Sequence, residues 1–286
     1  MAILHSVELV LAIQRISNPF LDILFRGASF LGSEFFYFAV LVFLYWGKHR
    51  RLAFYLAFLV LLSLYLNFLL KDFFRIPRPQ GEGLRILEQP EDFSFPSGHA
   101  QSVTTFWFFL AFMMCKPWLY FLAGSLTMLV SLSRLYLGVH FLQDVLVGNF
   151  LGIALAFLGF RCLRLFSRWK FSSLHTLPVL FLVSLLLFFC APSPLGVKVA
   201  GSLSGVLFGY WFTGFVGIPE SSFSKRDWLV GVLFLLLIYL GGKILPFSGH
   251  WWLFGRYFVL NFFATFGFPF LVTRWSPSKK CTLYRS

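Results

Sequence analysis

The sequence predicts an all-α fold, a polytopic transmembrane helical bundle of about nine spans. Of its 286 residues, 58% are hydrophobic and 12% are charged, whereas an ordinary soluble domain carries roughly 25% charged residues. The mean hydropathy of +0.79 leaves too little polar surface to cover a soluble core of this size. Apolar stretches long enough to cross a bilayer recur along the whole chain. These observations exclude an ordinary water-soluble protein.

Nine apolar stretches are candidates for membrane spans. A helix that crosses the hydrocarbon core needs about 20 apolar residues, with a range of roughly 17 to 25. The clearest stretch, Leu52 to Leu70, contains no charged residue, while the fifth and the eighth stretches are short. In chain order the stretches lie near residues 28–46, 52–70, 97–115, 117–136, 142–160, 174–191, 197–217, 228–245 and 252–272.

Composition and motif position divide the chain into three regions. Apolar residues recur at near-helical spacing within residues 3–16, among polar residues such as Glu8. We therefore expect residues 1–18 to form an interfacial amphipathic helix. The chemical motifs described below all lie before residue 145. This position predicts a core over residues 19–160 that carries the motifs, followed over residues 161–286 by additional transmembrane helices and a cytoplasmic tail.

The distribution of basic residues predicts the orientation in the membrane. Lysine and arginine near span ends are retained on the cytoplasmic side, and one set of alternate connections carries 14 of the 24 Lys and Arg residues. We therefore place the N-terminus outside and the C-terminus in the cytoplasm. The net charge of +13 follows from these basic loops, so no nucleic-acid partner is expected. The compact chain without long tails favours a bacterial inner membrane.

Two cations lie at the outer end of the second predicted span. Lys71 ends this span and Arg78 lies just outside it, where Pro77 and Pro79 stop the helix. Both cations are therefore fixed at the membrane surface. The loop that follows is acidic and lies on the same side of the membrane; it contains Glu82, Glu88, Glu91 and Asp92.

A helix N-terminus follows this loop. Residues 95–100 open the third predicted span, so the backbone N–H groups near Ser97, Gly98 and His99 lie at a natural anion site. Glycine at this position allows the close approach of a ligand.

A third cation, a second histidine and an acid lie in residues 133–144. Arg134 is followed by His140, and Asp144 comes four residues after His140. On a helix this spacing puts His140 and Asp144 on one face.

The predicted topology brings these segments to the same membrane face, so we expect them to converge. Three cations, a helix N-terminus and a serine hydroxyl form a site suited to a compact, highly charged anion such as phosphate. Two histidines can then supply a nucleophile and an acid. The remaining carboxylates lack the dense cluster that Mg²⁺ needs, so we expect neither a metal nor another cofactor.

Three complete motifs, in order, resemble those of the type 2 phosphatidic acid phosphatase (PAP2) superfamily. The resemblance covers roughly residues 20–160, implies a PAP2-type helical core, and is greatest to the sphingosine-phosphate phosphatase branch. The motifs are Lys71 with six residues before Arg78-Pro79, then Pro96-Ser97-Gly98-His99, then Ser133-Arg134 with five residues before His140 and three more before Asp144.

The resemblance also implies a role for each motif residue. His140 would attack phosphorus to give a phosphohistidine, and Asp144 would orient its imidazole. His99 would protonate the leaving alkoxide and then activate water. The groups that would hold the phosphoryl oxygens are Lys71, Arg78, Ser97, Gly98 and Arg134.

The function implied is hydrolysis of a lipid phosphate monoester or diphosphate at the outer membrane face, with the substrate and membrane lipids as partners. Three alternatives are open at this point. A lipid phosphotransferase would use the same nucleophile, and nine spans with an external N-terminus also resemble the glucose-6-phosphatase branch, whose substrate is a sugar phosphate. A non-enzymatic lipid transporter is the third. Residues 246–250 imitate the second motif, but no partner arginine or His-to-Asp pair follows them, so we interpret them as a turn.

Overall fold

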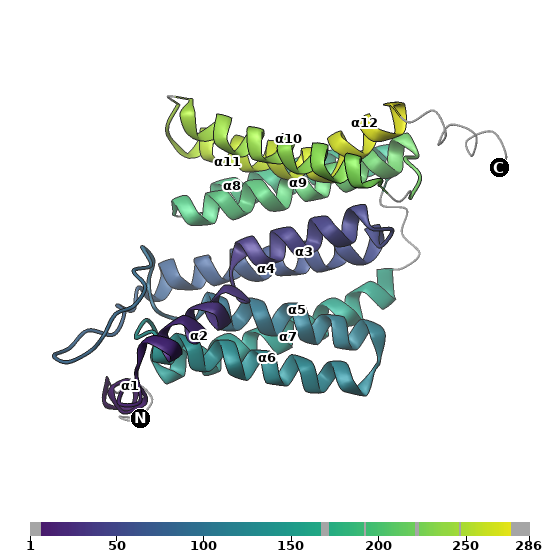
Figure 1. Cartoon of the computed structure of the whole chain (residues 1–286). Coiled ribbons are helices and arrows are strands. Elements are labelled where there is room, and N and C mark those ends of the chain that lie inside the picture. Colours follow the sequence, from purple (N-terminus) through teal and green to yellow (C-terminus); the bar gives the residue numbers. More distant parts are fainter. Residues whose placement is uncertain (1–6, 167–171, 192, 221–222, 246, 276–286) are drawn as a thin grey trace. The chain divides into compact units, whose positions relative to one another are not determined.

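The computed structural model describes residues 7–166, 172–191, 193–220, 223–245 and 247–275 (Figure 1). Within these ranges every regular element is a helix and no strand is present. The predicted all-α class is therefore confirmed for the described part of the chain.

The chain forms two compact units. Unit 1 comprises Met1–Phe38 and Leu62–Ser167, and unit 2 comprises Ala39–Leu61 and Arg168–Ser286. The functional division expected from the motifs, with boundaries at residues 18 and 160, stays a prediction. Two helices contribute residues to both units, α3 (Glu34–Trp46) and α4 (Arg50–Phe74).

Unit 1 is built around α5, which packs against both α6 and α7 (Figure 1). Two glycines of α7 allow the close approach. A Cβ at Gly148 would lie 2.7 Å from the Ser97 carbonyl oxygen, and one at Gly152 would lie 2.7 Å from the Gln101 carbonyl oxygen. The start of α7 therefore lies beside the start of α5. The helices that belong wholly to unit 1 are α1 (Val7–Gln14), α2 (Pro19–Phe30), α5 (Gly98–Met114), α6 (Pro117–Tyr136) and α7 (Leu142–Phe166).

Buried side-chain amide groups connect α4 to the first turn of α5. The Asn67 side-chain amide donates to Gln101 Oε1 at 2.8 Å and to the Pro96 carbonyl at 3.2 Å. The Gln101 amide in turn donates to the Ser63 carbonyl at 2.9 Å. Because buried polar groups need hydrogen-bond partners, this chain of contacts fixes the register of the two helices.

Hydrogen bonds hold the segment between α4 and α5, residues 75–97, which contains no helix or strand. The Ser94 N–H donates to the Ile76 carbonyl at 2.8 Å and so draws the two ends of the segment together. Gln14 of α1 donates to the Arg85 carbonyl at 2.8 Å. The described helix of the predicted segment 1–18, α1, thus packs on this loop, whereas residues 1–6 lie outside the described residues. The position of the segment on a membrane surface remains a prediction.

Unit 2 packs α9 tightly against α11 through glycines. A Cβ at Gly201 would lie 2.3 Å from the Phe254 carbonyl oxygen, and one at Gly205 would lie 2.4 Å from the Phe258 carbonyl oxygen. Glycine in α9 thus serves close helix packing. The elements that belong wholly to unit 2 are a 3₁₀ turn (Leu174–Thr176), α8 (Leu177–Phe189), α9 (Pro194–Val216), α10 (Lys225–Ile244), α11 (His250–Phe262), a π-helical turn (Phe263–Gly267) and α12 (Phe268–Trp275).

Six described helical segments are long and apolar enough to cross a membrane, or seven if the bent pair α2 and α3 forms one broken span. Each of the nine predicted stretches falls on helix, but the number of spans is not confirmed. The α5 helix has only 17 residues and α8 only 13. Polar side chains of α5, among them Thr104 and Thr105, are fully buried inside unit 1, so this helix need not be apolar along its length.

We predict that Gly152→Ala destabilises unit 1, because the added carbon would lie 2.7 Å from both the Gln101 carbonyl oxygen and Thr104 Cβ. Overpacking of this kind costs about 1 to 3 kcal/mol. The thermal unfolding midpoint of the purified protein in detergent measures the effect. Gly124→Ala is the matched control, since no heavy atom lies within 4 Å of its added carbon. Equal midpoints for the two variants would contradict the packing argument.

Candidate active site

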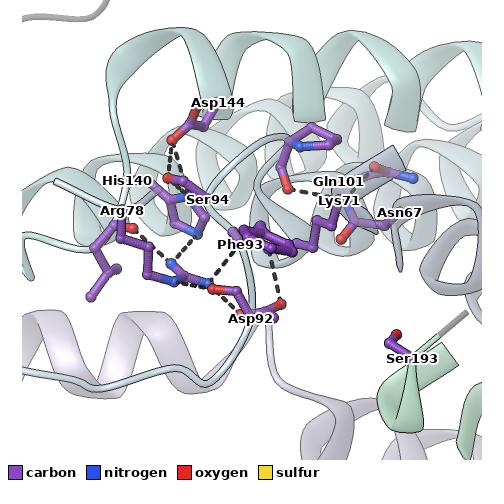
Figure 2. A network of polar contacts seen from close by, with 12 residues as sticks. Asn67, Lys71, Arg78, Asp92, Phe93, Ser94, Gln101, His140, Asp144 and Ser193 are labelled. Atoms are coloured by element: carbon purple, nitrogen blue, oxygen red, sulfur yellow. Dashed lines mark hydrogen bonds and ion pairs between the residues drawn. The ribbon is translucent and has the colours of Figure 1, made fainter. Parts of the chain in front are cut away.

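Asp92 bridges the two cations of the first motif (Figure 2). Lys71, in the last turn of α4, has a side chain that is 3% exposed, and its Nζ lies 2.9 Å from Asp92 Oδ2. Arg78 follows α4, and its Nη2 lies 2.5 Å from Asp92 Oδ1. The Lys71 ammonium also donates to the Phe93 carbonyl. Both cations therefore converge on one carboxylate of the loop.

His140 and Asp144 meet, as their spacing predicts. His140 Nδ1 lies 3.3 Å from Asp144 Oδ2. The expectation of a shared helix face is not met in detail, because His140 precedes the first residue of α7. Asp144 lies in the first turn of α7, and its carboxylate also accepts a hydrogen bond from the Phe141 N–H at 2.9 Å. This bond holds the carboxylate beside the residue that follows His140. Ser94 Oγ donates to the same carboxylate oxygen at 2.5 Å.

Arg78 contacts the other nitrogen of the His140 ring (Figure 2). Its Nη1 lies 3.2 Å from His140 Nε2 and donates to the Val139 carbonyl at 2.7 Å. A guanidinium group can only donate hydrogen bonds, so Nε2 is the acceptor and the ring proton lies on Nδ1, toward Asp144. The Nε2 lone pair consequently faces the cations of the first motif.

Arg134 is held by a second loop carboxylate. It lies in the last turn of α6, and its side chain is 1% exposed. Its Nη1 is 2.6 Å from Glu88 Oε2 and donates to Ser29 Oγ of α2 at 2.5 Å. The cation of the third motif thus has both a charged and a neutral partner.

The second motif begins α5 beside Asp144. Ser97 is the N-cap residue, and its N–H donates to the Asp144 carbonyl at 2.9 Å. The buried Ser97 Oγ has no hydrogen-bond partner among the described residues. A Cβ at Gly98 would lie 3.0 Å from Asn67 Oδ1. These contacts leave a serine hydroxyl available to a ligand at the start of α5.

His99 lies in the first turn of α5 and packs against the chain at Gly32. A Cβ at Gly32 would lie 3.1 Å from both Cβ and Cδ2 of His99. The charges that act on His99 are those of Arg134, Lys71 and Arg78. His99 therefore shares the electrostatic surroundings of all three motif cations.

The electrostatic surroundings keep His140 neutral and Asp92 ionised. Burial, followed by the nearby positive charges of Arg78 and Lys71, lowers the pKa of His140 well below its ordinary value. Burial alone raises the pKa of Asp92, but the charges of Lys71 and Arg78 outweigh it and hold that pKa below the usual range. A neutral imidazole is the form in which histidine acts as a nucleophile.

Three residues of this network were not expected from the motifs, namely Glu88, Asp92 and Ser94. The position of the acidic loop on the same side of the membrane as the motifs could have indicated Glu88 and Asp92. No feature of the sequence indicated Ser94. In the described part of the chain, no three His, Cys, Asp or Glu side chains gather as metal ligands would.

Comparison with known proteins gives a consistent family match, and residues 51–168 match the PAP2 superfamily. Dihydrosphingosine 1-phosphate phosphatase C823.11 of Schizosaccharomyces pombe is 28% identical over 73% of this chain and 56% of its own length. Phosphatidylglycerophosphatase B of Bacillus subtilis is 33% identical over 50% of this chain and 75% of its own length. Sphingosine-1-phosphate phosphatase 2 of Mus musculus is 33% identical over 46% of this chain and 40% of its own length.

This chain belongs to the PAP2 superfamily, as its motifs predicted. It is a multi-pass membrane protein with an all-helical fold over the described residues. The aligned region spans 56% of the Schizosaccharomyces pombe relative and 40% of the mouse relative.

We predict that Asp92→Asn lowers the free energy of unfolding by about 1 to 3 kcal/mol at neutral pH, because it removes the partner of two cations. The folded-state pKa of Asp92 is lowered, so its carboxylate stabilises the protein above about pH 4, and this contribution is lost as the pH falls through the lowered value. Thermal midpoints measured from neutral to acidic pH should show the gap between wild type and variant closing in acid. A gap that stays constant would contradict the assigned charge state.

Proposed function

We propose that this protein hydrolyses a lipid phosphate monoester or diphosphate through a covalent phosphohistidine on His140. The observation that carries the proposal is the position of the His140 imidazole, between the carboxylate of Asp144 and the guanidinium of Arg78. Membership in the PAP2 superfamily supports the same class of reaction.

In the first half-reaction, Nε2 of His140 forms a bond to phosphorus as the bond from phosphorus to the lipid oxygen breaks. Asp144 keeps the ring proton on Nδ1 and stabilises the positive charge that the imidazole gains. The three motif cations, with the groups of Ser97 and Gly98 at the start of α5, offset the charge on the phosphoryl oxygens in the transition state. His99 gives a proton to the leaving alkoxide.

In the second half-reaction, water attacks the phosphohistidine. His99, now neutral, accepts a proton from this water as its oxygen bonds to phosphorus. The bond from phosphorus to His140 Nε2 breaks, inorganic phosphate leaves, and the imidazole returns to its neutral form. The low pKa of His140 favours this return, because the burial and the nearby cations that lower it disfavour a charged ring.

A lipid is the substrate class that the surroundings of the site favour. Lys71 lies in the last turn of an apolar 25-residue helix. If that helix crosses the bilayer, its end places Lys71 at the depth of the lipid headgroups. Two of the relatives named above are phosphatases of sphingoid phosphates, and the third is a phosphatidylglycerophosphatase. These names support a phosphate group on a membrane lipid.

The proposal also covers the side of the membrane on which the site lies and the part of the chain that carries out catalysis. The basic residues of alternate connections support an outward-facing site and a cytoplasmic C-terminus. A bacterial inner membrane is the location that we propose. All motif residues lie within residues 19–160, which supports catalysis by that core, with residues 161–286 as added helices.

We predict that His140→Ala lowers phosphate release by at least about a thousandfold, because it removes the nucleophile. The assay measures inorganic phosphate from phosphatidic acid, phosphatidylglycerol phosphate, sphingosine phosphate, undecaprenyl diphosphate and glucose 6-phosphate. His250→Ala is the matched control, since His250 also follows a Ser-Gly pair but lies in unit 2.

Unchanged release by His140→Ala would contradict the phosphohistidine. No release of inorganic phosphate by wild type, together with transfer of the phosphoryl group to an added acceptor lipid, would favour a phosphotransferase. A preference for glucose 6-phosphate over every lipid would favour a sugar-phosphate phosphatase.

We predict that Ser94→Ala lowers kcat about tenfold with little change in KM, because Asp144 loses a hydroxyl that donates to it at 2.5 Å. Ser94 acts on Asp144 and so positions the nucleophile rather than contacting the substrate. Ser102→Ala is the control, since the Ser102 hydroxyl is buried in α5 with no hydrogen-bond partner among the described residues. Equal kcat values for the two variants would contradict a positioning role for Ser94.

A further inference from the structure

Each of the three motif cations is paired with a carboxylate of the loop 75–97. Asp92 places one oxygen 2.9 Å from Lys71 Nζ and the other 2.5 Å from Arg78 Nη2. Glu88 lies 2.6 Å from Arg134 Nη1. The motif cations are therefore paired with anions that belong to the chain itself. Figure 2 shows the one at Asp92.

The geometry at Asp92 is that of a bound oxyanion. Two oxygens of one carboxylate are shared between two cations, as two oxygens of a phosphoryl group would be. With Glu88 included, two loop carboxylates are paired with the three cations. A ligand must therefore compete with resident carboxylates rather than enter an open site of three positive charges.

The phospholipids of the bilayer are themselves anions that could compete for the motif cations. Ordinary phospholipid headgroups are phosphodiesters, each with a single negative charge on its phosphate, and they surround any site at headgroup depth. An open cluster of three cations would bind them by charge alone. A carboxylate also carries one negative charge, so a phosphodiester gains little by replacing it. A phosphate monoester or a diphosphate carries more charge and more free oxygens.

We propose that Asp92 and Glu88 are specificity-determining residues that exclude phosphodiester headgroups from the site and yield it to phosphate monoesters and diphosphates. The inference rests on the proposed function, since it concerns the same phosphoryl site. Both acids can leave toward water, because their side chains are 19% and 31% exposed and lie on a loop without regular structure. Lys71 and Arg134, at 3% and 1% exposed, cannot follow them.

The test measures anion binding without turnover. Full-length wild type, Asp92→Asn, Glu88→Gln and the control Glu91→Gln are purified in an uncharged detergent. Glu91 is an exposed acid of the same loop, outside the ion pairs of the site. The thermal midpoint of each protein is followed against rising phosphatidylglycerol, a singly charged phosphodiester, and separately against inorganic phosphate.

We expect phosphatidylglycerol to stabilise Asp92→Asn at a concentration about tenfold lower than wild type requires, because the negative charge that competes for Lys71 and Arg78 is gone. Glu88→Gln should shift in the same direction, and Glu91→Gln should match wild type. Inorganic phosphate should stabilise all four proteins. The use of two variants keeps the test decisive if one of them does not fold.

Unchanged or weaker binding of phosphatidylglycerol by Asp92→Asn and Glu88→Gln would overturn the inference, because the acids would then merely hold the cations in place. Equal stabilisation of wild type by the diester and by phosphate would overturn it as well. Failure of the proposed function looks different: wild type would release no phosphate from any lipid, while the binding comparison would still give its own answer.

Discussion

Burial of the Asp144 carboxylate is the constraint on which the rest of the site depends. Its side chain is fully buried, so it needs donors that the protein itself supplies. Those donors are Ser94 Oγ, the Phe141 N–H and His140 Nδ1, while the Asp144 carbonyl accepts the Ser97 N–H. Asp144 thus connects the end of the acidic loop, His140 and the start of α5.

Close helix packing is what allows this convergence. The Ser97 and Asp144 backbones can meet only because α7 presents glycine where it crosses α5, at Gly148 and again at Gly152. The buried amides of Asn67 and Gln101 then fix α4 against the same helix, which brings the helix that carries Lys71 into place. Packing between helices therefore sets the relative positions of the candidate site residues.

Positive charge inside an apolar protein imposes a second requirement. Buried cations are costly unless they are paired, and Lys71 and Arg134 are almost completely enclosed. The loop carboxylates Asp92 and Glu88 meet this requirement in the structure, and in the proposed reaction a phosphoryl group would take their place. Under the proposed specificity, the same ion pairs would contribute both to the stability of the protein and to the choice of ligand.

The sequence by itself determined the helical class, the family and the motif residues. Apolar length marks helices, and the sequence places His140 and Asp144 close together along the chain. Their contact does not come from a shared helix face, because the histidine precedes α7. Only the tertiary structure decided that Asp92, Glu88 and Ser94 enter the site and that residues 39–61 group with the C-terminal helices. The reason is physical. The backbone geometry of a helix repeats, so the spacing of apolar residues in the local sequence predicts it. The path of an irregular loop depends instead on buried charges and unpaired hydrogen-bond donors that belong to segments distant in the sequence.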